Sequence, residues 1–399
     1  MKKYQSDLRQ RIRDLQHFGE EGGVVPVIDV AATSTFLNPD DMVKTFNGEK
    51  KGCYLYSRQS NPSVKMFSEK MAAFEDMPAA LGVASGMAAI SASVEQLMPE
   101  GGELISALGV YGGTYALFKN VFPKQGIETH FVDMDDLEKV ESLINPRTKV
   151  LYVETLSNPL LKVANLVGLG KLSKKYGLKL VVDNTFAPAL VHPAHFGADV
   201  VVHSCTKFIS GSSDLLAGVI IGSEEFIASL VDVNTGIVML KGAVMDSRVA
   251  HELYVRLDHL PIRMQAHSKA ALFLAEHLEQ AGLKVTYPGF KKHPHYQRMI
   301  ELMNSDFGFG GMLVVDLGSA ERAQKLAKSL QDEKFGLYAV SLGFSRTLLS
   351  CPAVSTSSEL SEEDQEELHL TPGLLRVSVG YTGVDSIMFE RFMNCYKKL

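Results

Sequence analysis

The sequence predicts an α/β protein built on a mainly parallel, doubly wound sheet, followed by a smaller C-terminal α/β domain. Between about residues 60 and 225, short β-rich runs alternate with helical stretches, as in a parallel sheet with crossover helices. The runs are almost continuously apolar, as expected for strands covered on both faces. After about residue 255, longer amphipathic helices dominate. We therefore expect an N-terminal arm over 1–59, a main domain over 60–255 and a second domain over 256–399.

The N-terminal arm is predicted because residues 1–59 contain no long periodic element after a first helix. The segment ends in "YLYSRQSNP", which is rich in polar and turn-forming residues. Six strands are then predicted for the main domain: "GGELISAL", "ETHFVDM", "TKVLYVET", "LKLVVDNT", "ADVVVHS" and "LAGVIIG".

In the second domain, "QAHSKAALFLAEHLEQAG" predicts a helix that ends at a C-cap glycine, and "GGMLVVDL" predicts a strand. The serine-rich segment "STSSELSEEDQEEL" predicts a turn that leads into an acidic helix start.

Composition and charge exclude several classes of protein. A chain of 399 residues with 46% hydrophobic residues and a formal charge of −6 gives no global basis for binding nucleic acid or an anionic membrane. No run of 18 apolar residues predicts a membrane span. The polar N-terminus lacks the apolar core of a secretory signal, so a cytoplasmic location is expected. The four cysteines form no C-x-x-C pair and no H-E-x-x-H motif occurs, so no metal site is expected.

Chemically active residues follow the predicted strands, at the edge where ligands bind in open α/β sheets. Asp183 follows "LVV", and Thr206 and Lys207 follow "VVVHS". If the strand continues, Ser204 and Thr206 face one side and Lys207 the other. Ser85 and Gly86 begin a predicted helix, whose free amides favour a phosphate.

A phosphate site, a buried lysine and an aspartate at neighbouring strand ends together indicate pyridoxal phosphate. Desolvation makes the neutral lysine amine available for a Schiff base, and the aspartate holds the pyridine nitrogen protonated. Each residue also has a simpler interpretation. Lys207 could be a surface lysine at the start of a loop, Asp183 could form an Asx-turn, and Ser85 could be only an N-cap.

The stretch "VVDNTFAPALVHPAHFGADVVVHSCTKFISGSSDLLAG" resembles the signature of the Cys/Met-metabolism family of pyridoxal-phosphate enzymes. This family includes cystathionine γ-synthase, cystathionine β- and γ-lyases, methionine γ-lyase and O-acetylhomoserine sulfhydrylase. The similarity extends through "YSRQSNPS", "VASGMAAI", "VYGGTYALF", "ETLSNP", "YAVSLG" and "LLRVSVG", and so covers nearly the whole chain. The resemblance implies the aminotransferase-like transferase fold, known as fold type I.

The resemblance also implies roles for the residues around the cofactor. Lys207 forms the imine and afterwards moves protons, Asp183 pairs with the pyridine nitrogen, and Tyr111 stacks on the ring and takes part in catalysis. The set assigned to the phosphate is Gly86, Met87, Ser204 and Thr206, joined by Tyr56 and Arg58 from a neighbouring subunit.

On the substrate side, Asn158 lies near the phenolic oxygen of the cofactor, and Arg376 binds the α-carboxylate with help from Ser341. Because sites are shared between neighbours, the resemblance implies a homo-oligomer, at least a dimer and extending to a tetramer of two dimers.

Four positions depart from the patterns of the family or its subgroups. Ser212 and Ser357 stand where the family commonly has histidine. Gly113 replaces the cysteine that methionine γ-lyases usually carry beside the ring tyrosine, as in the cystathionine enzymes. Val340 stands where cystathionine enzymes often place a glutamate for the distal amino group. Gly113 therefore favours a cystathionine enzyme, whereas Val340 argues against one.

We predict a carbon–sulfur lyase that acts on a sulfur amino acid and releases a thiol, a 2-oxo acid and ammonia. The alternative within the family is a γ-replacement synthase that condenses an activated homoserine ester with cysteine or sulfide. An aminotransferase would retain Lys207 and Asp183 but gives no reason for "YSRQSNP". A non-enzymatic binding protein is the fourth interpretation, favoured by the two missing histidines.

Overall fold

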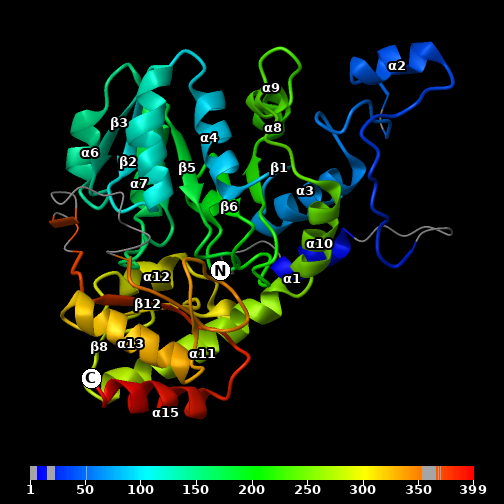
Figure 1. Cartoon of the computed structure of the whole chain (residues 1–399). Coiled ribbons are helices and arrows are strands. Elements are labelled where there is room, and N and C mark those ends of the chain that lie inside the picture. The colour runs from blue at the N-terminus through cyan, green and yellow to red at the C-terminus, as the bar shows by residue number, and fades with distance from the viewer. Residues whose placement is uncertain (1–6, 16–22, 51, 353–364, 367, 369) are drawn as a thin grey trace.

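The computed structural model describes the chain except for residues 1–6, 16–22, 51, 353–364, 367 and 369. Figure 1 shows a large domain, a smaller domain below it and an N-terminal segment that extends to one side. The acidic helix start predicted within 355–368 lies almost wholly outside the described residues.

The large domain is built on a seven-stranded sheet with the order β1-β7-β6-β5-β4-β2-β3. The four pairs of neighbouring strands among β2, β3, β4, β5 and β6 are parallel. The two pairs that β7 forms, with β1 and with β6, are antiparallel. The predicted mainly parallel sheet is therefore confirmed, as are all six predicted strands. The first strand was not predicted, because "AALGV" lacks a β-branched run. The strands are β1 Ala79–Val83, β2 Gly102–Ala107, β3 Ile127–Val132, β4 Thr148–Glu154, β5 Lys179–Asp183, β6 Val200–Ser204 and β7 Gly218–Gly222.

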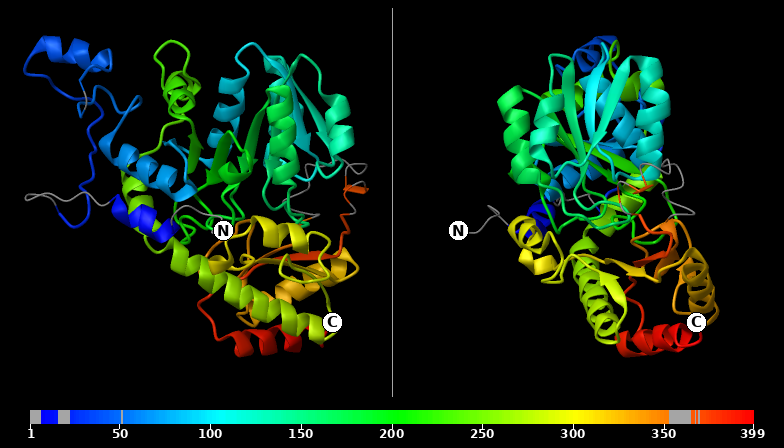
Figure 2. Two further views of the ribbon diagram at one scale, coloured as in Figure 1. Left: turned by 180° about the vertical axis from the view of Figure 1, so that it is seen from behind. Right: turned by 90° about the vertical axis from the view of Figure 1, so that its left-hand side faces the viewer.

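Helices cover both faces of this sheet (Figure 2). Side-chain caps start several of them, because Asn61, Ser85 and Asn165 each accept a hydrogen bond from a free backbone amide in the first turn. None of the described helices combines the length and the apolar composition needed to cross a lipid bilayer. The helices are α3 Pro62–Glu75, α4 Gly86–Leu97, α5 Gly112–Ala116, α6 Leu137–Leu143, α7 Leu166–Tyr176, α8 Glu224–Leu230, α9 Ile237–Lys241 and α10 Ser247–Leu257.

The smaller domain contains a five-stranded sheet with the order β10-β11-β12-β9-β8. It has its own hydrophobic core, while the long helix α11 contributes Met264 to the first core and Ala271 to the second. The predicted helix and strand in this part of the chain are α11 and β9. The elements are α11 Leu260–Gln280, β8 Lys284–Thr286, α12 Tyr296–Leu302, β9 Met312–Asp316, α13 Ala320–Asp332, β10 Leu337–Tyr338, β11 Leu348–Ser350, β12 Leu374–Ser378 and α15 Asp385–Tyr396.

The N-terminal segment carries two short helices, α1 Leu8–Asp14 and α2 Pro39–Phe46. Helix α1 packs against the large domain through buried Leu8 and Ile12. Helix α2 buries none of its residues and stands away from both domains (Figures 1 and 2).

Candidate active site

A cavity of about 210 Å³ lies at the carboxyl ends of the parallel strands, where side chains of the smaller domain meet the large domain. Most of the predicted site residues line it together, namely Gly86, Met87, Tyr111, Asn158, Asp183, Ser204, Thr206, Lys207, Val340 and Arg376. Ser341 adjoins this set through a hydrogen bond from the Lys207 Nζ to its Oγ at 3.2 Å. The sequence-based prediction of a shared edge is therefore matched by the geometry, while the role of each residue stays a prediction.

Lys207 does not continue the strand, contrary to the prediction from side-chain alternation. Strand β6 ends at Ser204, and the Lys207 N–H donates to the Ser204 carbonyl at 3.2 Å in a turn. The turn brings Ser204, Thr206 and Lys207 to the same cavity, which alternation along a strand would not do. Burial lowers the pKa of Lys207, and the neighbouring Arg376 cation lowers it further. Both effects favour the neutral, nucleophilic amine.

Asp183 ends strand β5 and is buried. Its Oδ1 accepts the Thr185 N–H at 2.9 Å, so the Asx-type turn considered from the sequence is present beside the cavity. The Tyr152 hydroxyl donates to Oδ2 at 3.5 Å. Burial raises the pKa of Asp183. No lysine or arginine of the described part of the chain forms an ion pair with it, so this carboxylate can pair with a cationic ring nitrogen.

The first turn of α4 forms the part of the cavity predicted to hold a phosphate. The Ser85 hydroxyl accepts the Ala88 N–H at 3.1 Å, so Ser85 is the N-cap. A Cβ atom on Gly86 would lie 2.6 Å from the Cβ of Ser204, so only glycine permits this close approach. Thr185, which the sequence analysis did not assign, accepts the Ser204 N–H at 2.8 Å and holds the end of β6. Free amides and hydroxyls at a helix N-terminus suit an anion.

Arg376 lies on β12 and is almost fully buried, at 2% exposure. Its Nη1 donates to the Asn158 Oδ1 at 3.0 Å and its Nη2 to the Ser341 carbonyl at 3.3 Å. Burial lowers the pKa of Arg376 to about 10. Among the described residues no carboxylate forms an ion pair with this guanidinium. A substrate carboxylate would supply the missing negative charge in a bidentate contact.

Glu154 also lines the cavity, and the sequence analysis did not single it out. It ends β4 opposite Asp183 in the register of β4 with β5. Its Oε1 accepts the Tyr111 N–H at 2.6 Å. Burial raises the pKa of Glu154, and the Asp183 carboxylate raises it further. The signal in the sequence was a charged residue at the end of an apolar strand, the same signal that drew attention to Asp183.

Tyr56 and Arg58 lie outside the cavity of their own chain. The Arg58 Nη1 donates to the Met239 carbonyl at 2.8 Å, and its guanidinium lies 5.4 Å from the centre of the Tyr56 ring. Of the two positions that lack the usual histidine, Ser212 is exposed, whereas Ser357 lies outside the described residues. Val340 is 69% exposed and lines the cavity.

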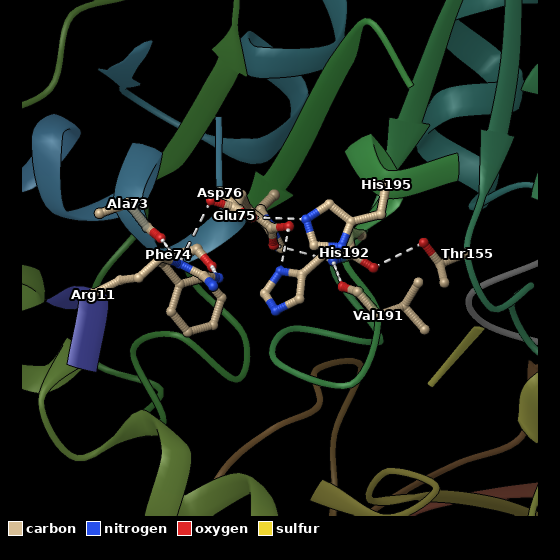
Figure 3. Close-up of polar contacts among 11 residues, drawn as sticks. Arg11, Ala73, Phe74, Glu75, Asp76, Thr155, Val191, His192 and His195 are labelled. Atoms are coloured by element: carbon tan, nitrogen blue, oxygen red, sulfur yellow. Dashed lines mark hydrogen bonds and ion pairs between the residues drawn. The ribbon is translucent and has the colours of Figure 1, made fainter. Parts of the chain in front are cut away.

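A second polar cluster lies behind the strand ends, around the buried carboxylate of Glu75 at the end of α3 (Figure 3). Glu75 contacts the His203 Nε2 at 2.7 Å, the Asn184 Nδ2 at 3.1 Å and the His192 Nδ1 at 3.4 Å. Two of these partners adjoin site residues, since Asn184 follows Asp183 and His203 precedes Ser204. Within the described part of the chain, no group of three or more His, Cys, Asp or Glu side chains could hold a metal ion.

Pyridoxal phosphate carries a phosphate, a protonatable ring nitrogen and an aldehyde, and the cavity offers a complementary group to each. The α4 amides suit the phosphate, Asp183 forms no ion pair with a described lysine or arginine, and the partly buried Lys207 amine is favoured in its neutral form. The residues present therefore fit this cofactor. Fold and cavity together define a pyridoxal-phosphate-dependent α/β enzyme.

The family profile described as "Cys/Met metabolism PLP-dependent enzyme" matches residues 11–390. The chain belongs to this family, as the motifs predicted. It is 42% identical to a methionine gamma-lyase of Arabidopsis thaliana, over 99% of this chain and 91% of the relative. It is 36% identical to a cystathionine gamma-lyase of Bacillus subtilis, over 88% and 91%.

Solved structures confirm the predicted fold type I. One is an assigned O-acetylhomoserine (thiol)-lyase of Campylobacter jejuni, whose structure contains a pyridoxyl-lysine phosphate group. It matches this chain with a TM-score of 0.91 at 26% identity, over 98% of this chain and 100% of that one.

Proposed function

We propose that the protein is a pyridoxal-phosphate-dependent carbon–sulfur lyase, which splits a sulfur amino acid into a thiol, a 2-oxo acid and ammonia. The observation that carries the proposal is the buried Arg376 guanidinium, which has no carboxylate partner among the described residues and lines the same cavity as Lys207. A guanidinium and a lysine amine in one cavity suit an α-amino acid substrate, because Arg376 can hold its carboxylate beside the Lys207 amine. The similarity to relatives named as methionine and cystathionine gamma-lyases supports the choice of substrate class.

The cofactor, when bound, supplies an electron sink for the bonds broken at the substrate carbons. In our proposal Lys207 would hold the cofactor through its amine and would move protons at the substrate carbon atoms. Asp183 keeps the ring nitrogen protonated. Arg376, fixed by Asn158 and the Ser341 carbonyl, orients the substrate through its carboxylate. Tyr111, which lines the cavity, would cover the ring, and its hydroxyl would assist proton transfer.

The phosphate end of the cofactor has two sources of contacts in this proposal. Gly86, Met87, Ser204 and Thr206 contribute from the same chain, where they line the cavity. Tyr56 and Arg58 contribute from a second copy, because in their own chain they lie outside it. The active unit is therefore a homodimer at least, and we extend the proposal to a tetramer of two dimers.

The arm over 1–59 supports this assembly. Val24, Val27 and Leu37 are almost fully exposed, and α2 buries none of its residues. A second copy would cover such apolar surface. In the proposed division of the chain, residues 60–255 bind the cofactor and 256–399 form the smaller domain. A cytoplasmic location is proposed because all four cysteines are free, as expected in a reducing compartment.

A product assay tests the proposed activity. The cofactor-loaded protein is incubated with methionine, homocysteine, cystathionine, cysteine or an O-acylhomoserine, and thiol, 2-oxo acid and ammonia are measured together. A lyase releases all three in equal amounts from a single sulfur amino acid. Transfer of the amino group without release of ammonia or thiol would identify an aminotransferase instead. No turnover with any of these substrates would support the binding-protein interpretation.

The second candidate is a γ-replacement synthase. It is favoured by the structural match to an enzyme assigned as an O-acetylhomoserine (thiol)-lyase. The two activities differ in whether a second nucleophile is admitted after the leaving group departs. Adding cysteine or sulfide to the O-acylhomoserine reaction separates them, because a synthase then forms a thioether or thiol amino acid and releases no 2-oxo acid.

A further inference from the structure

Glu154 has the position of a site residue without an assigned role. It is the last residue of β4, is 7% exposed and lines the cavity beside Asp183. No lysine or arginine of the described residues forms an ion pair with it. A buried carboxyl group costs free energy unless hydrogen bonds compensate it. The groups that offset the cost of burying the Glu154 carboxyl group therefore indicate the role of this residue.

Two backbone N–H groups from different loops act on the Glu154 carboxyl group. The Tyr111 N–H, which precedes α5, donates to Oε1 at 2.6 Å. The backbone N–H of Asn158, in the loop after β4, also acts on this carboxyl group and lowers its pKa. One side chain thus ties together the backbones of the residues predicted to contact the ring and the phenolic oxygen of the cofactor.

The connection continues from Asn158 to the substrate side of the cavity. The Asn158 Oδ1 accepts the Arg376 Nη1 at 3.0 Å, and the Arg376 Nη2 donates to the Ser341 carbonyl at 3.3 Å. A shift of the Asn158 backbone would therefore move the acceptor that orients the guanidinium. Arg376 is separated from Asn158 by 218 residues, so no local interaction can replace this contact.

Glu103 is a similar buried carboxylate in a different setting. It lies on β2 at 6% exposure and is compensated by the Asn145 Nδ2 at 2.6 Å, the His130 Nε2 at 2.9 Å and, unlike Glu154, by an arginine, the Arg147 Nη1 at 3.3 Å. These partners are side chains far from the cavity, at the opposite end of the sheet. Glu103 thus ties the sheet together but touches no site loop, which makes it a matched control for Glu154.

We propose that Glu154 is a positioning residue, which fixes the loops of Tyr111 and Asn158, and through Asn158 the Arg376 guanidinium, around the cofactor. This inference rests on the proposed function, because it assumes that the cavity binds pyridoxal phosphate. It predicts that loss of Glu154 weakens binding of the cofactor and of the substrate carboxylate, beyond any general loss of stability.

The test compares Glu154→Gln and Glu154→Ala with Glu103→Gln. Glutamine keeps one oxygen acceptor but presents an NH₂ group to the second N–H, whereas alanine loses both acceptors. We expect the Kd for pyridoxal phosphate, measured by equilibrium dialysis, to rise about tenfold in Glu154→Gln and about a hundredfold in Glu154→Ala. KM should rise by a larger factor than kcat falls. Glu103→Gln should lower Tm while leaving Kd and KM within about twofold of wild type.

Equal Kd and KM values in Glu154→Gln and Glu103→Gln would overturn the inference. If the Glu154 variants do not fold, amide hydrogen exchange in the wild-type protein decides. The Tyr111 and Asn158 amides should exchange slowly although both lie outside strands and long helices, and rapid exchange at both would contradict the proposal. A wild-type protein that binds no pyridoxal phosphate would instead refute the proposed function, so the two failures are distinguishable.

Discussion

Lys207 illustrates how a residue acquires its reactivity from its surroundings. Burial and the nearby Arg376 cation both lower its pKa, so more of the amine is neutral than in a surface lysine. The Ser341 hydroxyl holds the Nζ at 3.2 Å, which directs it into the cavity. Within the described part of the chain, this partly buried lysine forms no ion pair, which indicates that reactivity, not stability, explains its position.

We expect Lys207→Ala to lose the yellow colour of the covalently bound cofactor, because the amine anchors it. We expect kcat to fall about 10²–10⁴-fold, because the amine also carries protons. Absorption spectra and the product assay measure these effects, and circular dichroism checks that the variant is folded. Lys70→Met is the control. Lys70 is a buried lysine paired with Asp258 at 2.7 Å outside the cavity, so this variant should remain yellow. Wild-type turnover in Lys207→Ala would refute the mechanism.

Val340 is predicted to set the preference between substrates. Its exposed apolar side chain in the cavity offers no partner to the second ammonium group of cystathionine, whereas the tail of methionine or homocysteine can pack against it. Val340→Glu should shift the ratio of kcat/KM towards cystathionine by about tenfold to a hundredfold, since a partly desolvated ion pair contributes roughly 1–3 kcal/mol. Both substrates are measured with both proteins. An unchanged ratio in a folded, cofactor-loaded variant would remove Val340 as a determinant.

At the scale of elements, the site depends on parallel strands that end at the same edge. Strands β4 and β5 deliver Glu154 and Asp183 in register, and β6 ends one turn before Lys207. The Glu75 cluster supports this edge from behind, because the carboxylate at the end of α3 binds His203 of β6 and Asn184 after β5. The cluster therefore joins a helix to the two strands that carry Asp183 and Ser204.

Glu75→Gln should destabilise the protein by about 3 kcal/mol at pH 7, because it breaks a buried network. Burial alone would raise the pKa of Glu75, but the hydrogen bonds from His192 and His203 outweigh it and lower the pKa below 4.5. A carboxylate with a lowered folded-state pKa stabilises the protein above pH 4.5, and this contribution is lost as the pH falls further.

The Glu75→Gln variant should therefore lose less stability than wild type between pH 5 and pH 3, which thermal unfolding across this range measures. Asp76→Asn is the control, because this neighbour is partly exposed, binds His195 and Arg11 outside the fully buried network, and should cost at most about 1 kcal/mol. If the stability of wild type and of Glu75→Gln fell equally between pH 5 and pH 3, Glu75 would not be the group whose protonation destabilises the protein.

At the scale of the whole molecule, the cavity takes residues from two domains with separate cores, bridged by α11. The described residues of the N-terminal arm, Tyr56 and Arg58 included, do not line this cavity. Its exposed apolar residues and the free helix α2 instead favour contact with a second copy. In a symmetric pair, each arm would complete the site of the other chain.

Mixing two inactive variants tests this exchange. In a hybrid of Arg58→Ala with Lys207→Ala, one of the two sites receives an intact Arg58 and an intact Lys207. Random reassociation gives hybrids in half of the dimers, with one working site of two, so activity should recover to about a quarter of wild type. Subunit exchange is checked with differently tagged chains. Demonstrated exchange without recovery of activity would rule out the shared site.

The sequence by itself determined the strands of the large sheet, the edge at which they end and the residues that follow them. These features are local, because an apolar run predicts a buried strand and a parallel sheet places all its carboxyl ends together. Asp183, Lys207 and the start of α4 could therefore be identified before the structure. Motif resemblance added Arg376 and Asn158, and it also implied the family.

The tertiary structure alone decided which of these groups touch. Only the packing of the two domains brings Arg376 to Asn158, 218 residues away, and Ser341 to Lys207, 134 residues away. Only the turn after β6 sets the direction of Lys207, which side-chain alternation predicted wrongly. Glu154 carried the same signal as Asp183, a charged residue at the end of an apolar strand, but its contact with the Tyr111 backbone N–H follows from no residue type. Patterns in a sequence report local periodicity, whereas contacts between distant segments depend on how the finished elements pack.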